Sequence, residues 1–460
     1  MRFLLRFPLL LTWLVMGAAL SPVASAAEVT LQAVLSPAVT ALLKRAPVPA
    51  HLGLLVRDLD TGKVLEAARP DELFVPASTM KLVSMAARLT QTGPQSRYRV
   101  DVLAPAQEVS RHAKRISRLT LHGLGDPSLS ISGPYSLAAL AQQLTKSGIE
   151  EIGELRVSPS IDSATWPALP LGTPLVALRL QEYPGWNDSP DDYAARVTGA
   201  FAGQLRAVGI RVGAAASGLG RLVGEQSVQQ FGRVTAGYAP APAPIAATPE
   251  VSLASVQSPP LTALIRRTLK PSDNVWADQI AAQLGQVPGQ ASSEPLTHAG
   301  MVAGLRRFLM KVGVEPAPLT LSDASGLSQA NRLTPRTLVT VLERMYDLPI
   351  TNLKTPLTPA QAFAQRKNLF IEALPRGSTG IASAAARAEG GTLAERFIGS
   401  GLDVRAKTGT LPGASSLAGY VRAKSGHVLA FAIMVDQAPG NTLDLRAYQD
   451  RLLKVIAQSH

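Results

Sequence analysis

The sequence predicts an α/β (α+β) fold in which an antiparallel sheet, flanked by helices, is built from both ends of the chain. Two observations support this prediction. Hairpin-like apolar segments occur at residues 52–67 and again at residues 404–435, with helical periodicity between them. Residues 98–251 show short strand-like pieces separated by Gly and Pro instead. We therefore expect a sheet-and-helix core that is interrupted by a mostly β inserted region.

The individual elements follow from local patterns. Near the start, Asp60-Thr61-Gly62-Lys63 supplies the residues of a hairpin turn between two apolar runs. After Ser78, apolar residues recur at helical spacing over residues 80–89. Strands are expected at residues 52–59, 64–67, 404–407, 416–421 and 428–435, and further helices at residues 31–44, 261–269, 275–284, 299–312 and 443–456.

The N-terminus has the pattern of a secretory signal peptide. Arg2 and Arg6 precede an apolar run over residues 7–20, and small residues end the segment at Ala26. A membrane anchor is the alternative, but the apolar run is short for a span and breaks at Pro22. We expect cleavage after Ala26, and a mature chain without a transmembrane segment in the periplasm or cell envelope.

Composition excludes several kinds of chemistry. The 460 residues suffice for two or three domains, and the absence of cysteine rules out disulfides, a thiol nucleophile and thiolate-bound metal. The six histidines occur singly, so we expect no metal and no other cofactor. There is no G-x-S-x-G segment with an evident Asp and His after it. A serine enzyme with this sequence is therefore expected to use a base other than histidine.

The formal net charge is +12. One interpretation is attraction to an anionic cell wall or membrane surface, and the other is a solvated, arginine-rich surface. Nucleic acid is disfavoured as a partner, because the chain carries an export signal and lacks basic segments interleaved with aromatic residues.

Three short motifs carry the chemistry. In Ser78-Thr79-Met80-Lys81, a serine and a lysine three residues apart lie on one face of a helix, so the amine can reach the hydroxyl. A lysine whose pKa is lowered by burial can remove the proton from such a serine. In Ser272-Asp273-Asn274, a hydroxyl and an amide can point into the same cleft. In Lys407-Thr408-Gly409-Thr410, the glycine lets an extended substrate lie against a strand, and the lysine supplies charge for a carboxylate.

Each motif alone arises by chance in long proteins. All three in this order form the set shared by class A β-lactamases and penicillin-binding proteins. Beyond the motifs, the sequence resembles the class C low-molecular-mass penicillin-binding proteins, the D-alanyl-D-alanine carboxypeptidase/endopeptidases, over most of the mature chain. The segments that carry this resemblance are residues 76–81, 123–129, 258–261, 270–274, 323–328, 331–335, 391–393 and 405–411.

The resemblance implies a penicillin-recognising transpeptidase/β-lactamase-like domain formed discontinuously by residues 27–95 and 252–460. Residues 96–251 are then an inserted accessory region of one or two small domains. It also implies a serine DD-peptidase that acts on peptidoglycan stem peptides through an acyl-enzyme and is inhibited by β-lactam antibiotics. Ser78 is the expected nucleophile and Lys81 its base, Ser272 and Asn274 assist proton transfer and hold the substrate, Lys407, Thr408 and Gly409 bind it, and the backbone N–H groups of Ser78 and Thr410 form the oxyanion hole.

Some positions depart from the family pattern. Asp278 stands where Glu is expected, a conservative change that we place outside the chemistry, and Asp436 stands where Asn is usual. Residues 376–390 form a small Ala-rich insertion before Gly391. These departures concern substrate preference more than the core reaction.

Two rival functions remain at this point. A serine β-lactamase shares the three motifs, but it needs an added group for fast deacylation and usually lacks a long insertion. A non-catalytic peptidoglycan-binding protein with a decayed site is hard to reconcile with the intact motifs. The sequence does not separate carboxypeptidase from endopeptidase action, nor does it give the oligomeric state.

Overall fold

The computed structural model describes residues 34–45, 51–158, 160–167, 172–213, 249–286, 295–348, 350–351, 353, 355–438 and 442–460. The predicted signal peptide lies outside these residues. None of the helices in the described part of the chain is long and apolar enough to cross a membrane.

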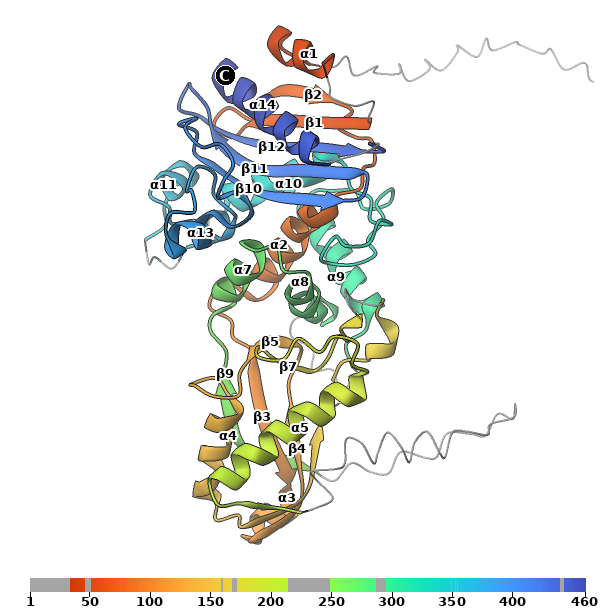
Figure 1. The fold of residues 1–460 in the computed structure, drawn as a ribbon, viewed down its shortest axis with the longest axis vertical. Coiled ribbons are helices and arrows are strands. Elements are labelled where there is room, and N and C mark those ends of the chain that lie inside the picture. Colours follow the sequence, from red (N-terminus) through yellow and green to blue (C-terminus); the bar gives the residue numbers. More distant parts are fainter. Residues whose placement is uncertain are drawn as a thin grey trace, which may run out of the picture. The chain divides into compact units, whose positions relative to one another are not determined.

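The first sheet joins the two ends of the chain, as the sequence predicts. Its order is β10-β11-β12-β1-β2, all pairs are antiparallel, and β1 from the N-terminal part pairs with β12 from the C-terminal part (Figure 1). All residues of β12 are buried, because both faces of the sheet are covered. The strands are β1 His51–Asp58, β2 Val64–Ala68, β10 Val404–Leu411, β11 Ala414–Arg422 and β12 Val428–Asp436.

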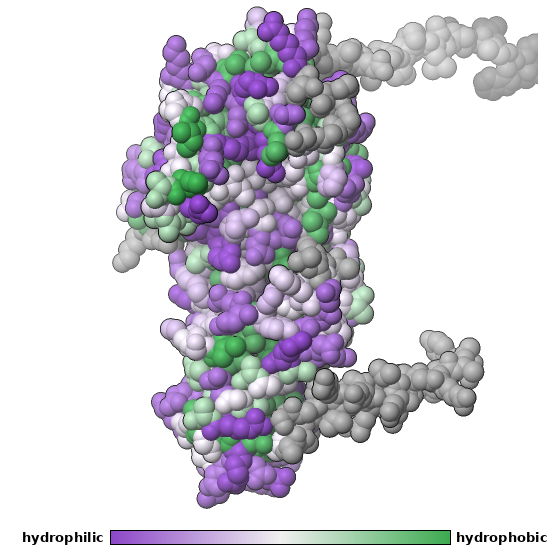
Figure 2. All heavy atoms as spheres, viewed as in Figure 1, coloured by the Kyte–Doolittle hydropathy of each residue, from purple (hydrophilic) through white to green (hydrophobic). Residues whose placement is uncertain are grey.

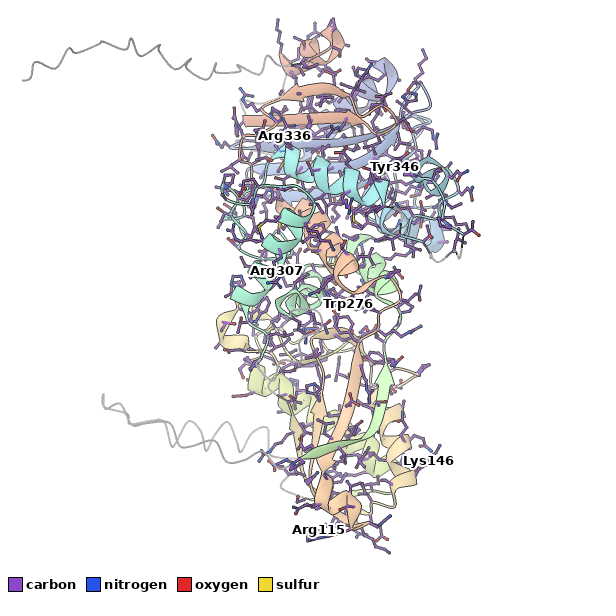
Figure 3. The ribbon with its side chains drawn as sticks, turned by 180° about the vertical axis from the view of Figure 1, so that it is seen from behind. Arg115, Lys146, Trp276, Arg307, Arg336 and Tyr346 are labelled. Atoms are coloured by element: carbon purple, nitrogen blue, oxygen red, sulfur yellow. The ribbon has the colours of Figure 1, made fainter. Side chains whose placement is uncertain are left out.

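Helices cover both faces of this sheet. On one face, α14 (Thr442–Ser459) and α1 (Pro37–Leu43) enclose a core shared with Leu417 and Phe431. On the other face, α10 (Pro335–Asp347) packs its apolar side on the sheet, and Figure 3 shows its residues Arg336 and Tyr346 from that side.

The helix that follows the predicted nucleophile lies at the centre of the second core. The helix α2 (Met80–Thr92) has ten consecutive buried residues, Met80 to Leu89, because other helices and the sheet surround it. It is preceded by a short 3-10 turn, η1 (Ala77–Thr79). The surrounding helices are α7 Leu261–Leu269, α8 Asn274–Ala281 and α9 His298–Lys311, with α10 beside them.

The inserted region contains a second sheet of order β8-β6-β4-β3-β9. The entering strand β3 and the leaving strand β9 pair in antiparallel fashion, Arg99 opposite Gln257, whereas β4, β6 and β8 run parallel. Strand β9 belongs to this sheet, so the predicted boundary at residue 251 falls inside a strand. The division of the chain into domains at residues 96 and 251 stays a prediction. The strands are β3 Arg99–Pro105, β4 Arg115–His122, β6 Glu151–Val157, β8 Arg211–Val212 and β9 Glu250–Gln257, with a separate parallel pair, β5 Asp126–Leu129 and β7 Leu178–Leu180.

Helix α5 (Pro190–Ala207) is the main element that the sequence analysis missed in this region. Its signals were present: Ser189 and Asp192 form a capping box, and its buried side chains recur at helical spacing. Two glycines inside it, Gly199 and Gly203, weaken the helical pattern. The remaining helices are α3 Ala106–Ser110, α4 Leu137–Leu144, α11 Pro359–Ala364, α12 Leu369–Ala373 and α13 Ala384–Gly390, with 3-10 turns η2 Thr145–Ser147, η3 Ser163–Thr165, η5 Ala282–Gly285 and η6 Gly391–Leu393.

On the face drawn in Figure 2, hydrophobic residues form small separate patches among hydrophilic ones. Single exposed apolar residues are ordinary on folded chains and need no functional explanation.

Candidate active site

Ser78 and Lys81 meet at the start of α2. Ser78 lies half-buried in η1, and Lys81 lies fully buried one turn later. The Nζ atom of Lys81 is 3.1 Å from the Oγ atom of Ser78. The residue before the serine, Ala77, has a φ of +46°, a left-handed conformation that is unfavourable for a residue other than glycine. Such strain is common where a functional side chain has to be presented in one orientation.

The Lys81 amine has two further partners. Its Nζ atom donates to the side-chain oxygen of Asn274 at 2.6 Å and to the backbone carbonyl of Ser325 at 2.7 Å. As an ammonium group it thus uses all three hydrogens. As a neutral amine it retains two N–H bonds for Asn274 and Ser325, and its lone pair then points to the hydroxyl of Ser78.

Burial lowers the pKa of Lys81 to about 8, although the charges of Asp278, Asp323 and Asp273 oppose this change. A lysine with its ordinary pKa is almost wholly protonated at neutral pH and cannot accept a proton. At a pKa of about 8 a useful fraction of the amine is neutral, which is what a general base requires.

Asp278 holds the backbone segment that carries the Ser325 carbonyl. Its Oδ1 atom accepts the backbone N–H groups of Ala324 at 2.8 Å and Ser325 at 3.0 Å. Burial and the neighbouring Asp323 raise the pKa of Asp278. The carboxylate makes no hydrogen bond with Ser78 or Lys81 among the described residues, but it orients a group that does. Its position four residues after Asn274, on the same face of α8, is the sequence signal for this role.

The loop of residues 322–331 packs against η1, the turn that contains Ser78. Asp323 accepts the backbone N–H groups of Gly326 and Ser328, both at 2.6 Å, and the side-chain amide of Asn331 at 2.9 Å. Gly326 has a φ of +79°, and a Cβ atom there would collide with the carbonyl oxygen of Ala77. Only glycine permits this close approach of the loop to Ala77. The loop therefore borders the site, although it belongs to none of the three motifs.

The second motif reaches the site through Asn274. Asp273 caps α8 by accepting the N–H group of Trp276 at 3.0 Å, which places Asn274 in the first turn. Ser272 has a φ of +66°, a second strained non-glycine position at the site. Within the described part of the chain the Ser272 hydroxyl has no hydrogen-bond partner, so its predicted part in proton transfer stays a prediction.

The third motif lies on β10 at the edge of the first sheet. Lys407 is fully buried and donates to the carbonyl of Thr408 at 2.7 Å. Burial and the charge of Lys81 hold the pKa of Lys407 well below its usual range. The Thr408 hydroxyl donates to the Thr392 hydroxyl at 2.8 Å, and both side chains are accessible. Thr392 therefore adds a polar group that the motif alone did not reveal.

The outer edge of β10 is paired at its start and can receive an extended peptide at Thr408 and Thr410. The N–H of Ala406 donates outward to Pro375 at 3.0 Å, and the carbonyl of Val404 accepts from Gly377 at 2.9 Å. Alternate residues of a strand direct their backbone groups to the same edge. Because the β10–β11 register is regular, the N–H groups of Thr408 and Thr410 point to that edge too.

Gly409 brings β10 against Pro76 and Ala77, the residues directly before Ser78. A Cβ atom at this position would lie 2.7 Å from the carbonyl oxygen of Pro76 and 3.0 Å from the Cβ atom of Ala77. The Ser416 hydroxyl on β11 donates to the same Pro76 carbonyl at 2.5 Å. The glycine is thus needed for close packing of the two motifs, in addition to the expected room for substrate.

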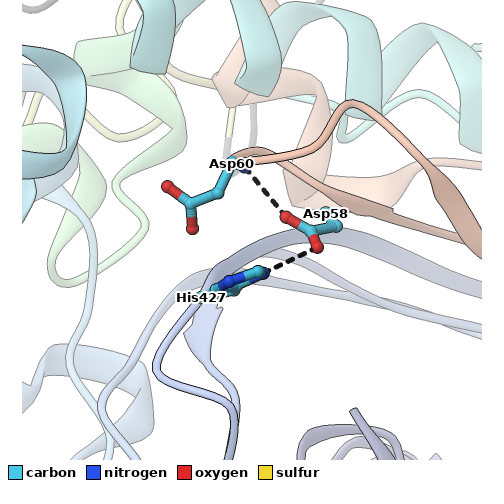
Figure 4. A group of neighbouring side chains, drawn as sticks. All are labelled: Asp58, Asp60 and His427. Carbon is cyan, nitrogen blue, oxygen red and sulfur yellow. Dashed lines mark hydrogen bonds and ion pairs between the residues drawn. The ribbon is translucent and has the colours of Figure 1, made fainter.

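A separate cluster, Asp58, Asp60 and His427, brings possible metal-ligand atoms within 4.8 Å of one another (Figure 4). Each carboxylate already has a structural partner. Asp58 accepts the N–H of Asp60 at 2.8 Å and pairs with His427 at 2.9 Å, while Asp60 accepts the N–H of Val428 at 2.9 Å. The cluster closes two adjacent hairpin turns of the first sheet.

Comparison with solved structures defines the class of fold. The chain is similar to penicillin binding protein 4 from Haemophilus influenzae, with a TM-score of 0.63 and 18% identity over 91% of this chain and 99% of that one. It is also similar to a predatory endopeptidase from Bdellovibrio bacteriovorus in complex with its immunity protein, with a TM-score of 0.51 and 16% identity over 88% and 92% of the two chains. The fold is that of the penicillin-binding proteins, which confirms the predicted fold class.

Comparison of sequences gives the family. The chain is 30% identical to a carboxypeptidase of Mycobacterium tuberculosis over 423 residues, 88% of this chain and 80% of that protein. It is 27% identical to a D-alanyl-D-alanine carboxypeptidase of an Actinomadura species over 447 residues, 83% and 77% of the two chains. The chain belongs to the D-Ala-D-Ala carboxypeptidase 3 (S13) family, whose model matches residues 35–168 and 187–458. It is accordingly a hydrolase of the serine carboxypeptidase type, as the sequence predicts.

Proposed function

We propose that this chain cleaves D-alanyl-D-alanine bonds of peptidoglycan stem peptides through an acyl-enzyme on Ser78, and that β-lactams inhibit it by acylating the same serine. The observation that carries the proposal is the 3.1 Å contact between Lys81 Nζ and Ser78 Oγ, made by an amine whose pKa is lowered to about 8. Family membership supports the substrate class.

Acylation starts from the neutral amine. Lys81 takes the proton of the Ser78 hydroxyl, and Oγ attacks the carbonyl carbon of the penultimate D-alanine. The backbone N–H groups of Ser78 and Thr410 are the proposed donors to the oxyanion, since η1 and the edge of β10 pack together through Gly409. When the C–N bond breaks, the leaving amine receives a proton, for which Ser272 is the proposed relay from Lys81.

The remaining residues bind substrate and complete the cycle. Lys407 and Thr408 are the proposed partners of the terminal carboxylate, which enters a site that contains two buried lysines. Asn274 holds the amine of Lys81 and the substrate backbone. Water then attacks the ester carbonyl with Lys81 as base, which releases the shortened peptide and restores the Ser78 hydroxyl.

The cellular setting is part of the proposal. The signal-peptide pattern at residues 1–26 supports export to the periplasm or cell envelope, where the substrate is found. We also retain the division into a discontinuous catalytic domain, residues 27–95 and 252–460, and an inserted region, residues 96–251.

The test is labelling of the purified mature protein with fluorescent penicillin, followed by intact-mass measurement. We expect a stable adduct in the wild type, none in Ser78→Ala, and an unchanged adduct in Ser110→Ala, which alters an exposed serine on α3. Absence of an adduct in the wild type would contradict the proposal. A short-lived adduct with rapid turnover of penicillin would identify a β-lactamase instead.

A further inference from the structure

A pocket of about 630 Å³ lies beside the carboxylate-binding residues proposed above. Its walls come from α7, the turn at Lys270 and Pro271, α13, and the turn at Gly391 and Thr392. The two turns are joined, because the N–H of Thr392 donates to the carbonyl of Lys270 at 3.1 Å. A volume of this size suits a small ligand.

The pocket adjoins the active site on two sides. Thr392, which lines it, accepts the hydrogen bond from Thr408 at 2.8 Å, and Pro271 is the residue directly before Ser272. The part of a bound substrate nearest to this pocket is therefore the leaving residue, whose carboxylate is assigned to Lys407 and Thr408. For D-alanine the side chain of that residue is one methyl group, which leaves the pocket almost unused.

The charges of the pocket are all positive. Its charged lining residues are three arginines and one lysine, without a carboxylate among them. Arg266 and Lys270 are already paired with Glu389. Arg267 and Arg387, by contrast, have no carboxylate partner among the described residues; the Arg267 guanidinium lies 5.0 Å from the centre of the Trp276 ring. Two uncompensated guanidinium groups next to an apolar wall favour an anionic group.

One wall belongs to the short helix α13 (Ala384–Gly390). Arg387 and Ala388 lie on α13, within the Ala-rich segment of residues 376–390 that the sequence predicts to be an insertion. The insertion is held in place by Glu389, which pairs with Arg266 and, at 2.6 Å, with Arg366. The pocket is thus a built feature at the place where substrate preference is expected to vary.

We propose that this pocket is a subsite for the leaving residue, and that it selects D-residues whose side chain carries a carboxylate. This inference rests on the proposed function. In the reaction the same C–N bond breaks and the same leaving amine is protonated; only the side chain of the released D-amino acid differs. Arg267 and Arg387 are the specificity-determining residues.

Three peptides with one common acyl part test the subsite. They end in D-Ala-D-Ala, D-Ala-D-Glu and D-Ala-D-Gln, and the last two differ in charge but hardly in shape. For the wild type we expect kcat/KM for the D-Glu peptide to exceed that for the D-Gln peptide about fivefold, the scale of partly exposed ion pairs. This ratio is expected to fall at high salt.

Variants assign the effect to residues. In R267Q/R387Q the ratio of D-Glu to D-Gln is expected to fall to about one, whereas hydrolysis of the D-Ala-D-Ala peptide and labelling of Ser78 by penicillin stay unchanged. The matched control R206Q, an exposed arginine at the end of α5, keeps the wild-type ratio. A ratio near one in the wild type, or a ratio that survives the double substitution, overturns the subsite while hydrolysis of D-Ala-D-Ala upholds the proposed function. Loss of penicillin labelling and of all hydrolysis in the wild type overturns both.

Discussion

Lys81 donates to the backbone carbonyl of Ser325 at 2.7 Å, a bond between the start of α2 and a loop 244 residues further along the chain. The acceptor is a backbone group, so no residue type in a sequence motif marks it. Asp278 holds the preceding backbone by accepting the N–H groups of Ala324 and Ser325. Asp323 accepts the N–H of Gly326, which belongs to the same peptide group as the Ser325 carbonyl. The orientation of the Lys81 amine thus depends on α2, on α8 through Asn274, and on the loop that carries Ser325. The rate of proton transfer from Ser78 should therefore depend on the pKa of this amine.

The rate of acylation of Ser78 by a β-lactam is expected to rise with pH through about 8. Only the neutral form of Lys81 accepts the serine proton, and burial lowers the pKa of Lys81 to about 8. The second-order acylation rate measured between pH 6 and 9.5 checks this. A rate that is already maximal at pH 6, with the protein folded throughout, would show that another group is the base.

Asp278→Asn is expected to move the rising limb of that profile to lower pH. The charge of Asp278 raises the pKa of Lys81 against the effect of burial, so removal of the charge lowers this pKa further. Asparagine can still accept the two backbone N–H groups, which preserves the position of the Ser325 carbonyl. The profile is compared with that of Asp71→Asn, a change in an exposed ion pair with Arg336. If the acylation rate rises over the same pH range as in the wild type, Asp278 only supports the local backbone and does not affect the pKa of Lys81.

Gly326→Ala is expected to destabilise the protein by more than about 2 kcal/mol, because a left-handed φ and a collision coincide there. It is also expected to lower acylation, since the adjacent Ser325 carbonyl must shift. Gly148→Ala is the matched control: its φ is +73° and nothing lies within 4 Å of the added Cβ atom, so strain of about 1–2 kcal/mol remains. Thermal unfolding and penicillin labelling measure both effects. Equal losses for the two variants would disprove the packing argument.

Much of the fold and part of the site could be predicted from the sequence. The sheet joining both ends was recognisable because its strands are apolar runs with turn residues between them, as at Asp60 to Lys63. The contact of Ser78 with Lys81 follows from their spacing on a helix, whereas the contact of Lys81 with Asn274 joins two separate motifs. Helix α5 was missed because two glycines interrupt its pattern.

The rest could not be predicted for physical reasons. The carbonyl of Ser325 is a backbone group, and no residue type marks its position. The sequence places Asp278 outside the chemistry, because a carboxylate that accepts backbone N–H groups has the same sequence pattern as one on a helix surface. The role of Gly409 in packing against Pro76 depends on a contact between segments more than 300 residues apart.

His427 is expected to stabilise the first sheet only over a limited pH range. The hydrogen bond to Asp58 and the charge of that carboxylate raise the pKa of His427 above its ordinary 6.5. Although burial raises it, hydrogen bonds from His427 and from backbone N–H groups lower the pKa of Asp58 below 3.8. A raised histidine pKa adds stability that is fully present below about pH 6.5 and is lost as pH rises through the folded-state pKa. A lowered carboxyl pKa adds stability above about pH 4 that is lost as pH falls through its folded value.

The difference in Tm between the wild type and His427→Gln should therefore be largest between about pH 4 and 6.5 and shrink at higher pH (Figure 4). The control His112→Asn changes an exposed histidine whose φ of +52° asparagine tolerates, and it should show no such window. A Tm difference that is constant from pH 4 to 9 would mean that His427 contributes by packing and not by its charge.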